Sequence, residues 1–594
     1  MLHNRWQSLT EMFFAQAQKL GPKPLLYSKQ NDAWVSLTWQ QTCEQVVRLA
    51  AALEKMDVGP GDRVVIVSEN RPEWLIADFA VMAIGAISVP TYTTNTSRDH
   101  LHILEDSSAK VAIISTKALA HTFLKAAHQS DDLCHAIVME SYTMNQHINV
   151  DLHSWQQVID AEKTNVEHYR SRAANVSKDD IACLIYTSGT GGAPKGVMQH
   201  HGSILHNCYA ASLIIKPLGL KDNRFLSFLP LSHAYEHTAG QCLPLMIGAE
   251  IWYAESIEKM AGNMAEAHPT IMIVVPRLFE MLRTRISRKI EKEGGTKEKL
   301  FKRAMELGMK QERHGQPLTT KEKLENIFLT LTVRKKVRKQ FGGQLKALVS
   351  GGAPLNPDVG YFFSALGLRL LQGYGQTEAG PVISVNPSTG PRMHTVGKPL
   401  DKTDVKIAED GEILVRGELV MKGYWGDEKS TRRTIVNGWL HTGDIGVLDS
   451  DGYLEITDRK KDLIVNDKGD NVSPQRIEGM MALEEEISQV MIYGDRRPYL
   501  VALIVPDSEW MQAWAADHNK PTDFETLRTD KDFRKAVSNA IDRINRNLSN
   551  LEKVRRFAFA HEPFSIENQQ MTPTLKLKRH IVRDVYEDVF SGMY

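Results

Sequence analysis

Cysteine is scarce in this sequence, with five residues in a chain of 594. A disulfide framework or a structural zinc site would need thiols that are paired or closely spaced. The cysteines are odd in number, scattered, and include no C-x-x-C pair: Cys43, Cys134, Cys183, Cys208 and Cys242. The pattern therefore argues against both kinds of site. A reducing compartment fits it best, and we expect a cytoplasmic location.

Long apolar runs are absent as well. No run approaches the roughly 20 apolar residues that a membrane-spanning helix needs. The stretch before Gly21 interrupts its apolar residues with Gln, Glu and Lys, and it lacks a small-residue cleavage site. It therefore predicts neither a membrane span nor a signal peptide. We expect an amphipathic helix there, capped by Ser8 or Thr10 and ended by Gly21.

Excess charge of one sign is the third absence, since 72 basic side chains balance 72 acidic ones. The overall charge gives no reason to expect a nucleic acid partner, and none is predicted. Residues 283–340 are a local exception, with 18 Lys and Arg against 7 Asp and Glu. They predict a basic helical insertion. The charges of this insertion could simply form a solvated surface. Alternatively, they could contact a phosphorylated ligand or anionic lipid, in which case the protein would lie peripherally at the inner face of the membrane.

Helical and strand patterns alternate along the first half of the chain. Residues 38–56 and 71–86 have the spacing of helices, whereas 63–68 and 109–116 are short β-branched runs typical of strands. This alternation predicts an α/β fold with largely parallel sheets. After about residue 400, short strand-like runs separated by turn residues predict a small antiparallel subdomain.

A charged break, DRKKD, runs from Asp458 to Asp462. We predict a domain boundary there. The N-terminal domain, residues 1–460, would contain stacked α/β subdomains and the small β subdomain. The C-terminal domain, residues 461–594, would be a smaller α+β unit.

The stretch LIYTSGTGGAPKGV, from Leu184 to Val197, is rich in groups that bind phosphate. An apolar run suited to a buried strand leads into hydroxyls and backbone amides that can surround phosphate oxygens. A Walker loop has a different form, because Pro194 precedes Lys195 here and a glycine follows it. The predicted phosphate-binding residues are Thr187, Ser188, Gly189, Thr190, Gly192 and Lys195.

This loop resembles the signature of the adenylate-forming, or AMP-binding, superfamily, which includes acyl-CoA synthetases, luciferases and adenylation domains of peptide synthetases. Gly191 departs from the family wording, which usually has a second Thr at that position. Five further stretches resemble family motifs in the same order: LVSGGAPL (348–355), LLQGYGQTEAG (370–380), GWLHTGDIG (438–446), DRKKDLIV (458–465) and MTPTLKLKR (571–579). The resemblance covers nearly the whole chain.

The resemblance implies an ATP site built from these motifs. Tyr374 would stack on the adenine and Thr377 would reach a phosphate oxygen. Glu378 and Thr187 would offer hard oxygen ligands to Mg²⁺. Asp444 would accept hydrogen bonds from both ribose hydroxyls. The other nucleotide-binding positions that it implies are Gly352, Ala353, Gly373 and Arg459.

The resemblance also identifies catalytic and hinge residues. The spacing from Thr572, together with Arg579, identifies Lys576 rather than Lys578 as the catalytic lysine, although the usual Ser-Gly before it is replaced. Lys195 and Glu378 complete the predicted catalytic set. Lys461 occupies the hinge position about which the C-terminal domain of this family rotates.

The implied reaction joins an acid to coenzyme A. ATP and the acid would form an acyl-AMP with release of pyrophosphate, and coenzyme A would then displace AMP. The basic insertion and the chain ending resemble bacterial long-chain fatty-acyl-CoA synthetases. His233 is the candidate for the acyl pocket, where it faces the substrate carboxylate or serves as a structural histidine.

Other functions stay open at this stage. The acceptor could be a carrier protein instead of coenzyme A, and the acid could be medium-chain or aromatic. A non-catalytic nucleotide sensor with this fold is a further alternative, and the family motifs argue against it. The sequence leaves an oligomeric state open.

Overall fold

Seven strands form the first sheet of the N-terminal region, in the order β7-β6-β5-β3-β4-β8-β9. The computed structural model describes residues 5–142, 149–187, 193–572 and 576–594. Neighbouring strands run parallel except for β8 and β9, which form an antiparallel pair. The strands are β3 (Arg63–Val67), β4 (Ile87–Thr91), β5 (Val111–Ile114), β6 (His135–Val138), β7 (Asp151–Ser154), β8 (Ile181–Thr187) and β9 (Lys195–His200).

A second sheet has nine strands, in the order β16-β15-β14-β13-β12-β10-β11-β1-β2. Its centre is parallel, and the antiparallel strands β2, β15 and β16 lie at its two ends. The strands are β1 (Pro24–Gln30), β2 (Ala33–Thr38), β10 (Arg224–Ser227), β11 (Glu250–Tyr253), β12 (Ile271–Val274), β13 (Ala347–Ser350), β14 (Leu370–Gly375), β15 (Val382–Val385) and β16 (Lys398–Pro399). The largely parallel α/β fold predicted from the alternating pattern is confirmed.

Helix α3 (Pro72–Ala83) joins the two sheets. It contacts β3 and β4 of the first sheet and β1 of the second, and all its residues except Glu73 are buried. A helix that is apolar on nearly every side must be buried on all sides, and α3 achieves this by packing against both sheets. The other helices of this region are α1 (Leu9–Leu20), α2 (Trp39–Lys55), α4 (Ser97–Ser107), α5 (Lys117–Ala127), α6 (Trp155–Ala161), α7 (Val166–Ala173), α8 (His201–Ile215), α9 (Leu243–Ile247), α10 (Met260–Ala267) and α15 (Pro357–Ala365), with the short turns η1 (Lys216–Leu218) and η4 (Thr377–Ala379) and the π-helix η2 (Glu236–Cys242).

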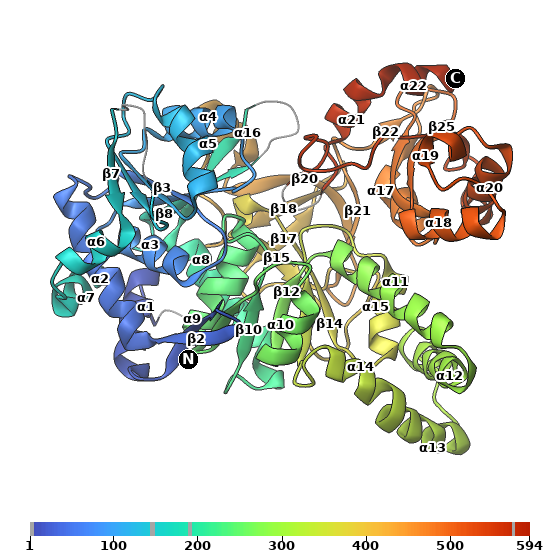
Figure 1. Ribbon diagram of the computed structural model, residues 1–594, viewed down its shortest axis with the longest axis horizontal. Coiled ribbons are helices and arrows are strands. Elements are labelled where there is room, and N and C mark those ends of the chain that lie inside the picture. Colours follow the sequence, from blue (N-terminus) through green and yellow to red (C-terminus); the bar gives the residue numbers. More distant parts are fainter. Residues whose placement is uncertain (1–4, 143–148, 188–192, 573–575) are drawn as a thin grey trace.

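Helices alone connect β12 to β13, in the stretch predicted as a basic insertion. They are α11 (Pro276–Glu293), α12 (Gly295–Glu312), α13 (Thr320–Leu329), the π-helix η3 (Thr330–Arg334) and α14 (Lys335–Gln340). Helix α11 lies nearest the C-terminal domain, and α13 forms the outer tip of the molecule (Figure 1). The insertion therefore reaches from the interdomain region to an exposed end.

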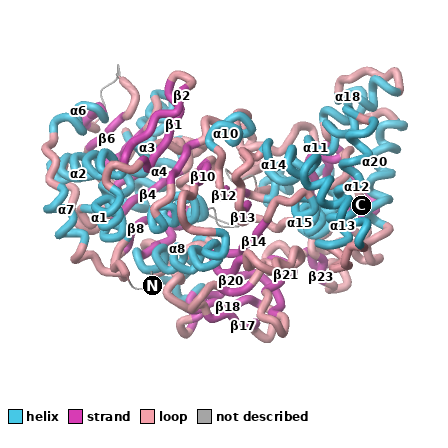
Figure 2. Tube along the Cα trace, turned by 90° about the horizontal axis from the view of Figure 1, so that it is seen from below, coloured by secondary structure: helices cyan, strands magenta, loops and turns pink. Residues whose placement is uncertain are grey.

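A small antiparallel sheet follows the second sheet, in the position predicted for a β subdomain. It contains β17 (Asp404–Ile407), β18 (Glu412–Arg416), β19 (Ile435–Val436), β20 (Trp439–Leu448) and β21 (Leu454–Arg459). Helix α16 (Glu428–Thr434) precedes β19. In the tube view, this sheet lies at the lower edge of the molecule, below α8 and β14 (Figure 2).

The C-terminal residues form their own sheet and two apolar clusters, drawn from Ile464 onward. Strands β24 (Ile487–Tyr493), β25 (Leu500–Pro506) and β26 (Val554–Phe559) make the sheet, and β22 (Ile464–Val465) pairs with β23 (Asn471–Val472). The helices are α17 (Pro474–Met481), α18 (Ser508–Asp517), α19 (Phe524–Leu527), α20 (Lys531–Asn545), α21 (Arg579–Val585) and α22 (Glu587–Gly592). The chain thus has a large N-terminal and a small C-terminal domain, as predicted.

Among the described residues, no helix has both the length and the apolar character required to cross a bilayer. All five cysteines are free thiols, four of them buried and Cys134 exposed.

Candidate active site

The candidate residues gather where parallel strands end. Strand β13 leads into the Gly-Gly-Ala turn with Gly352, β14 leads into Thr377 and Glu378, and β10 leads toward His233. In open α/β sheets, ligands bind in the crevice outside the carboxyl ends of the strands. The second sheet therefore brings three predicted stretches to one edge.

Asp444 is buried with both carboxylate oxygens engaged. The Tyr374 hydroxyl donates to Oδ2 at 2.7 Å, and Arg459 Nε donates to Oδ1 at 2.8 Å. Asp444 and Arg459 are direct partners across β20 and β21. Burial and the Asp444 charge together raise the pKa of the Tyr374 hydroxyl well above its ordinary value. Three residues predicted around the adenosine thus form one hydrogen-bonded unit.

Glu378 lies beside a tyrosine that the sequence analysis did not single out. The Tyr424 hydroxyl donates to Glu378 Oε1 at 2.8 Å, and the backbone N–H of Met421 donates to the Glu378 carbonyl at 3.0 Å. No group of three or more His, Cys, Asp or Glu side chains in the described part of the chain is arranged to hold a metal ion. A cation at Glu378 would therefore need hydroxyl or phosphate oxygens as further ligands.

The Lys195 side chain makes its contacts at the start of helix α16. Its Nζ lies 2.9 Å from Asp427 Oδ2, donates to the Ser430 hydroxyl, and stands 5.2 Å from the centre of the Tyr424 ring. Thr187, the last residue of β8, pairs with Lys195 at the start of β9. The loop thus connects two antiparallel strands, unlike a Walker loop, which opens a helix.

Lys576 reaches this site from the C-terminal domain. Desolvation, followed by the positive charge of Arg459, lowers the pKa of the Lys576 ammonium to about 8, while Asp444 and Glu378 act in the opposite direction. Lys576 is nevertheless exposed at its own surface. Lys576 thus interacts electrostatically with three residues of the N-terminal domain that were predicted to bind ATP or its metal ion.

His233 is neutral and close to the same lysine. Burial and the Lys576 charge lower the pKa of its imidazole to about 3. The backbone N–H of Tyr235 donates to Nδ1 at 3.1 Å, which assigns the remaining proton to Nε2. His233 therefore presents a neutral N–H donor near the candidate site.

The Gly-Gly-Ala turn needs its glycines. A Cβ on Gly351 would lie 2.8 Å from the Tyr235 ring, and Gly352 has a φ of +82°. L-residues with side chains rarely adopt that backbone conformation. Within β14, a Cβ on Gly373 would approach the Ser384 carbonyl to 3.2 Å. Ala353 follows the turn and is half-buried.

Several predicted residues lie outside the described part of the chain. They are Ser188, Gly189, Thr190 and Gly192 of the loop, together with the departure at Gly191. The predicted hinge residue Lys461 is described and lies exposed in the turn after β21. The predictions for these residues therefore stay predictions.

Tyr424, Asp427 and Gly375 are site residues that the sequence analysis missed. Tyr424 and Asp427 contact Glu378 and Lys195 across more than 40 and 230 positions of the chain. A Cβ on Gly375 would lie 1.9 Å from the Pro381 carbonyl oxygen. The stretch KGYWGD around Tyr424 has no periodic pattern, and it is placed at the site by its backbone hydrogen bonds to β9 and by these side-chain contacts.

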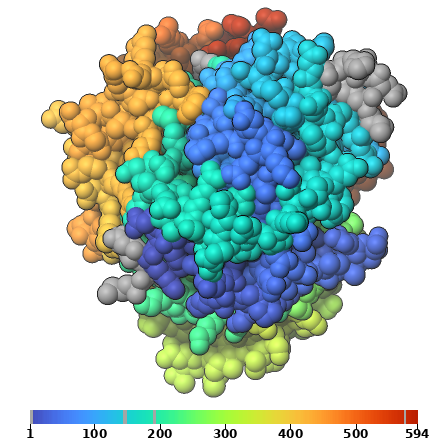
Figure 3. Space-filling model, turned by 90° about the vertical axis from the view of Figure 1, so that its left-hand side faces the viewer, coloured from blue at the N-terminus to red at the C-terminus, as the bar shows by residue number. Residues whose placement is uncertain are grey.

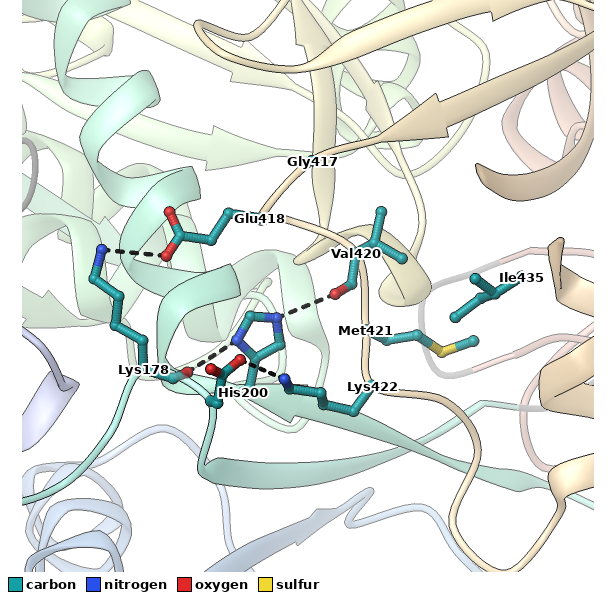
Figure 4. Close-up of a pocket in the computed structure, with 9 residues that line it drawn as sticks. Lys178, His200, Gly417, Glu418, Val420, Met421, Lys422 and Ile435 are labelled. Atoms are coloured by element: carbon teal, nitrogen blue, oxygen red, sulfur yellow. Dashed lines mark hydrogen bonds and ion pairs between the residues drawn. The ribbon is translucent and has the colours of Figure 1, made fainter. Parts of the chain in front are cut away.

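A separate surface pocket of about 460 Å³ lies between the start of α8 and residues 417–422 (Figure 4). Figure 4 shows the His200 ring pointing between two backbone carbonyls, those of Lys178 at 3.0 Å and Val420 at 3.1 Å. Ion pairs join Lys178 to Glu418 and Lys422 to Asp179. The pocket contains none of the predicted site residues, and its charges neutralise one another.

Family comparisons agree with this arrangement of motifs. The profile described as AMP-binding enzyme matches residues 13–425, and that described as AMP-binding enzyme C-terminal domain matches residues 461–594. The chain is 32% identical over 580 residues to the long-chain-fatty-acid–CoA ligase FadD15 of Mycobacterium tuberculosis, covering 96% of this chain and 95% of that protein. It is 28% identical over 620 residues to the human long-chain-fatty-acid–CoA ligase 1, covering 99% and 86%.

Solved structures share the fold at lower identity. The anthranilate CoA ligase AuaEII in complex with anthranoyl-AMP has a TM-score of 0.74 at 19% identity, covering 99% of this chain and 98% of that one. The A domain of a carboxylic acid reductase from Segniliparus rugosus, in complex with AMP and a carboxylic acid, also has a TM-score of 0.74 at 19% identity, with 100% and 95% covered.

Proposed function

Because this chain belongs to the AMP-binding enzyme family, we propose that it is an acid–thiol ligase that activates a long-chain fatty acid with ATP and transfers it to coenzyme A. The full-length similarity to long-chain-fatty-acid–CoA ligases supports this substrate class. The observation that carries the proposal is that Arg459, Asp444 and Glu378 of the N-terminal domain act electrostatically on Lys576 of the C-terminal domain.

The first step would join the acid to AMP. A carboxylate oxygen attacks the α-phosphorus of ATP, and pyrophosphate leaves as the new phosphorus–oxygen bond forms. Since two anions meet, catalysis depends mainly on positioning and on opposite charge. Lys576 would bridge the carboxylate and the α-phosphate, and Lys195 would neutralise the departing pyrophosphate. His233 would donate its Nε2 proton in a hydrogen bond to the acid.

Mg²⁺ fits the chemistry of the donors near Glu378. The Tyr424 hydroxyl donates to one Glu378 oxygen, which leaves the other for a hard cation, and the hydroxyl of Thr187 would be a further ligand. When bound, the ion would neutralise phosphate charge. Asp444 would bind the ribose hydroxyls through the lone pairs that Tyr374 and Arg459 leave free, because each carboxylate oxygen can accept more than one hydrogen bond.

The second step would transfer the acyl group to the thiol of coenzyme A, with AMP as the leaving group. We propose that residues 461–594 rotate about Lys461 after adenylation, which withdraws Lys576. The exposed turn of Lys461 can absorb such a change. We also propose that the protein is cytoplasmic and contacts the inner face of the membrane peripherally. Its free thiols agree with a reducing compartment.

The test is AMP release from ATP across acids of increasing chain length, with and without coenzyme A. We expect coenzyme A-dependent release that is greatest with long-chain acids and falls at least about 100-fold in Lys576→Ala. Transfer to a carrier protein, with no response to coenzyme A, would contradict the proposed acceptor. Preference for medium-chain or aromatic acids would contradict the substrate class, and absence of pyrophosphate exchange with all acids would favour a nucleotide sensor.

A further inference from the structure

Helix α13 and the following π-helix η3 carry an apolar stripe that nothing in the described part of the chain covers. The stripe consists of Leu324, Ile327, Phe328 and Leu331, which are 68%, 59%, 52% and 63% exposed. Their spacing of i, i+3, i+4 and i+7 places them on one side of a helix. Isolated exposed apolar residues are common on proteins, but a contiguous stripe of large ones marks an interaction surface.

The opposite side of this helix accounts for its folding. Leu329 is buried in a small cluster with Ala304 and Leu307 of α12, and Val333 packs against it. The inward side is therefore already satisfied, and the stripe contributes nothing to that cluster. It is a second, outward-facing apolar surface on the same helix.

The carboxylates of α13 are neutralised from within the insertion. Glu322 pairs with Lys310 at 2.8 Å, and Glu325 pairs with Arg303 at 2.9 Å. The exposed lysines near the stripe form no ion pair with any described residue: Lys321, Lys323, Lys335, Lys336 and Lys339. The outward surface of α13, η3 and α14 therefore combines apolar side chains with unneutralised positive charge.

This surface stands at the end of the molecule. Helix α13 lies at the outer tip of the insertion, away from the C-terminal domain (Figure 1). In the space-filling view, the yellow-green residues of this region project at the lower edge (Figure 3). A flat partner can therefore meet the stripe without touching the rest of the protein.

The geometry points to an anionic lipid bilayer as the partner of this stripe. The four apolar side chains would enter the interface between headgroups and acyl chains, and the lysines would contact anionic headgroups. A symmetric contact between two copies would instead oppose lysine to lysine. The inference deepens the peripheral association proposed above, because it specifies the contacting surface and the lipid charge.

Vesicle co-sedimentation of the full chain tests the inference. It is done without ATP or coenzyme A, so its failure is distinguishable from failure of the AMP-release assay. We expect binding to phosphatidylcholine vesicles that contain about 30% phosphatidylglycerol, and at least about tenfold weaker binding to pure phosphatidylcholine. Raising NaCl from about 50 to 500 mM should weaken the anionic binding severalfold. Equal binding to both vesicle types, or none, would overturn the inference.

Variants separate the apolar and basic contributions. Ile327→Ser with Phe328→Ser, and separately Lys335→Glu with Lys336→Glu, should each lower anionic vesicle binding about tenfold. Leu551→Ser is the matched control, because Leu551 is a 48% exposed leucine in the C-terminal domain; its binding should equal that of the wild type. Unchanged AMP release on a detergent-dispersed acid would show that the variants are folded. The wild type could instead form a dimer and fail to bind vesicles, with the apolar variant monomeric. That combination of results would assign the stripe to a contact with a second copy of the chain.

Discussion

The surroundings of Lys576 change its acid–base chemistry. An ordinary lysine loses its proton far above neutral pH, but desolvation and the neighbouring Arg459 lower the pKa of this one to about 8. The charge that would bridge two anions is thus present below about pH 8 and lost above it. The same neighbours that make the site suitable for ATP also limit the pH range in which its lysine is charged.

This predicts an alkaline limb in the adenylation half-reaction. Acid-dependent ATP–pyrophosphate exchange should fall as the pH rises through about 8, because Lys576 deprotonates. Lys576→Arg should be slower but should keep its rate up to about pH 9.5, since a guanidinium stays charged. Lys578→Arg is the matched control and should retain the wild-type profile. A wild-type rate that stays level to pH 9.5 would show that Lys576 is not the titrating group.

The π-helix η2 follows His233, the candidate residue of the acyl pocket, and is closely packed at Gly240. A Cβ on Gly240 would lie 2.4 Å from the Glu236 carboxyl. That carboxyl is buried and accepts the Ser227 hydroxyl at 2.6 Å, so it has little freedom to move away. Burial raises the pKa of Glu236 to about 8, which keeps it protonated at neutral pH.

Gly240→Ala should therefore lower the free energy of unfolding by about 1–3 kcal/mol, the usual cost of overpacking. Gly262→Ala is the matched control in helix α10, where a new methyl group would meet no atom within 4 Å. It should leave stability unchanged or raise it by about 0.5–1 kcal/mol. Denaturant unfolding followed by circular dichroism measures both.

A second variant tests whether contact with the Glu236 carboxyl is the cause of the expected destabilisation. If the Glu236 carboxyl causes the cost, Gly240→Ala should be at least about 1 kcal/mol less destabilising in a Glu236→Ala protein. An identical cost in both backgrounds would point to backbone conformation instead.

At the scale of the whole molecule, the C-terminal domain is docked on the insertion. Arg288 of α11 lies 2.8 Å from Asp507 and 2.5 Å from Glu509 in the C-terminal domain. Arg277 of the same helix donates to the Ser488 carbonyl at 3.0 Å. In this docked orientation the charges of Arg459, Asp444 and Glu378 all act on the pKa of Lys576, so α11 would stabilise the arrangement proposed for adenylation.

Breaking the Arg288 contact should affect the two half-reactions differently. Exposed ion pairs contribute about 0–1 kcal/mol, so Arg288→Ala should slow pyrophosphate exchange about two- to fivefold. Thioester formation from supplied acyl-AMP should be unchanged or faster, because it requires the other orientation. Arg392→Ala, which loses two ion pairs within the N-terminal domain, is the control and should alter neither. Equal slowing of both steps by Arg288→Ala would contradict the model of two orientations.

The sequence by itself determined the local elements and the family. Helix α1 begins after the predicted cap Ser8, whose side chain accepts from the Glu11 N–H, and ends at Gly21. The predicted helices before residue 90 and the strands at Arg63 and Val111 also form, within a few residues. These signals depend on neighbours within one or two turns, so they can be recognised without knowledge of the fold.

Tertiary structure alone decided which distant groups meet. Tyr374 reaches Asp444 across 70 positions, and Lys195 reaches Asp427 across 232. Such contacts depend on strand order and on domain docking, which no local periodicity encodes. The same reason explains α13: the sequence predicted a basic helical insertion, but only the packing against α12 revealed which of its apolar residues remain exposed.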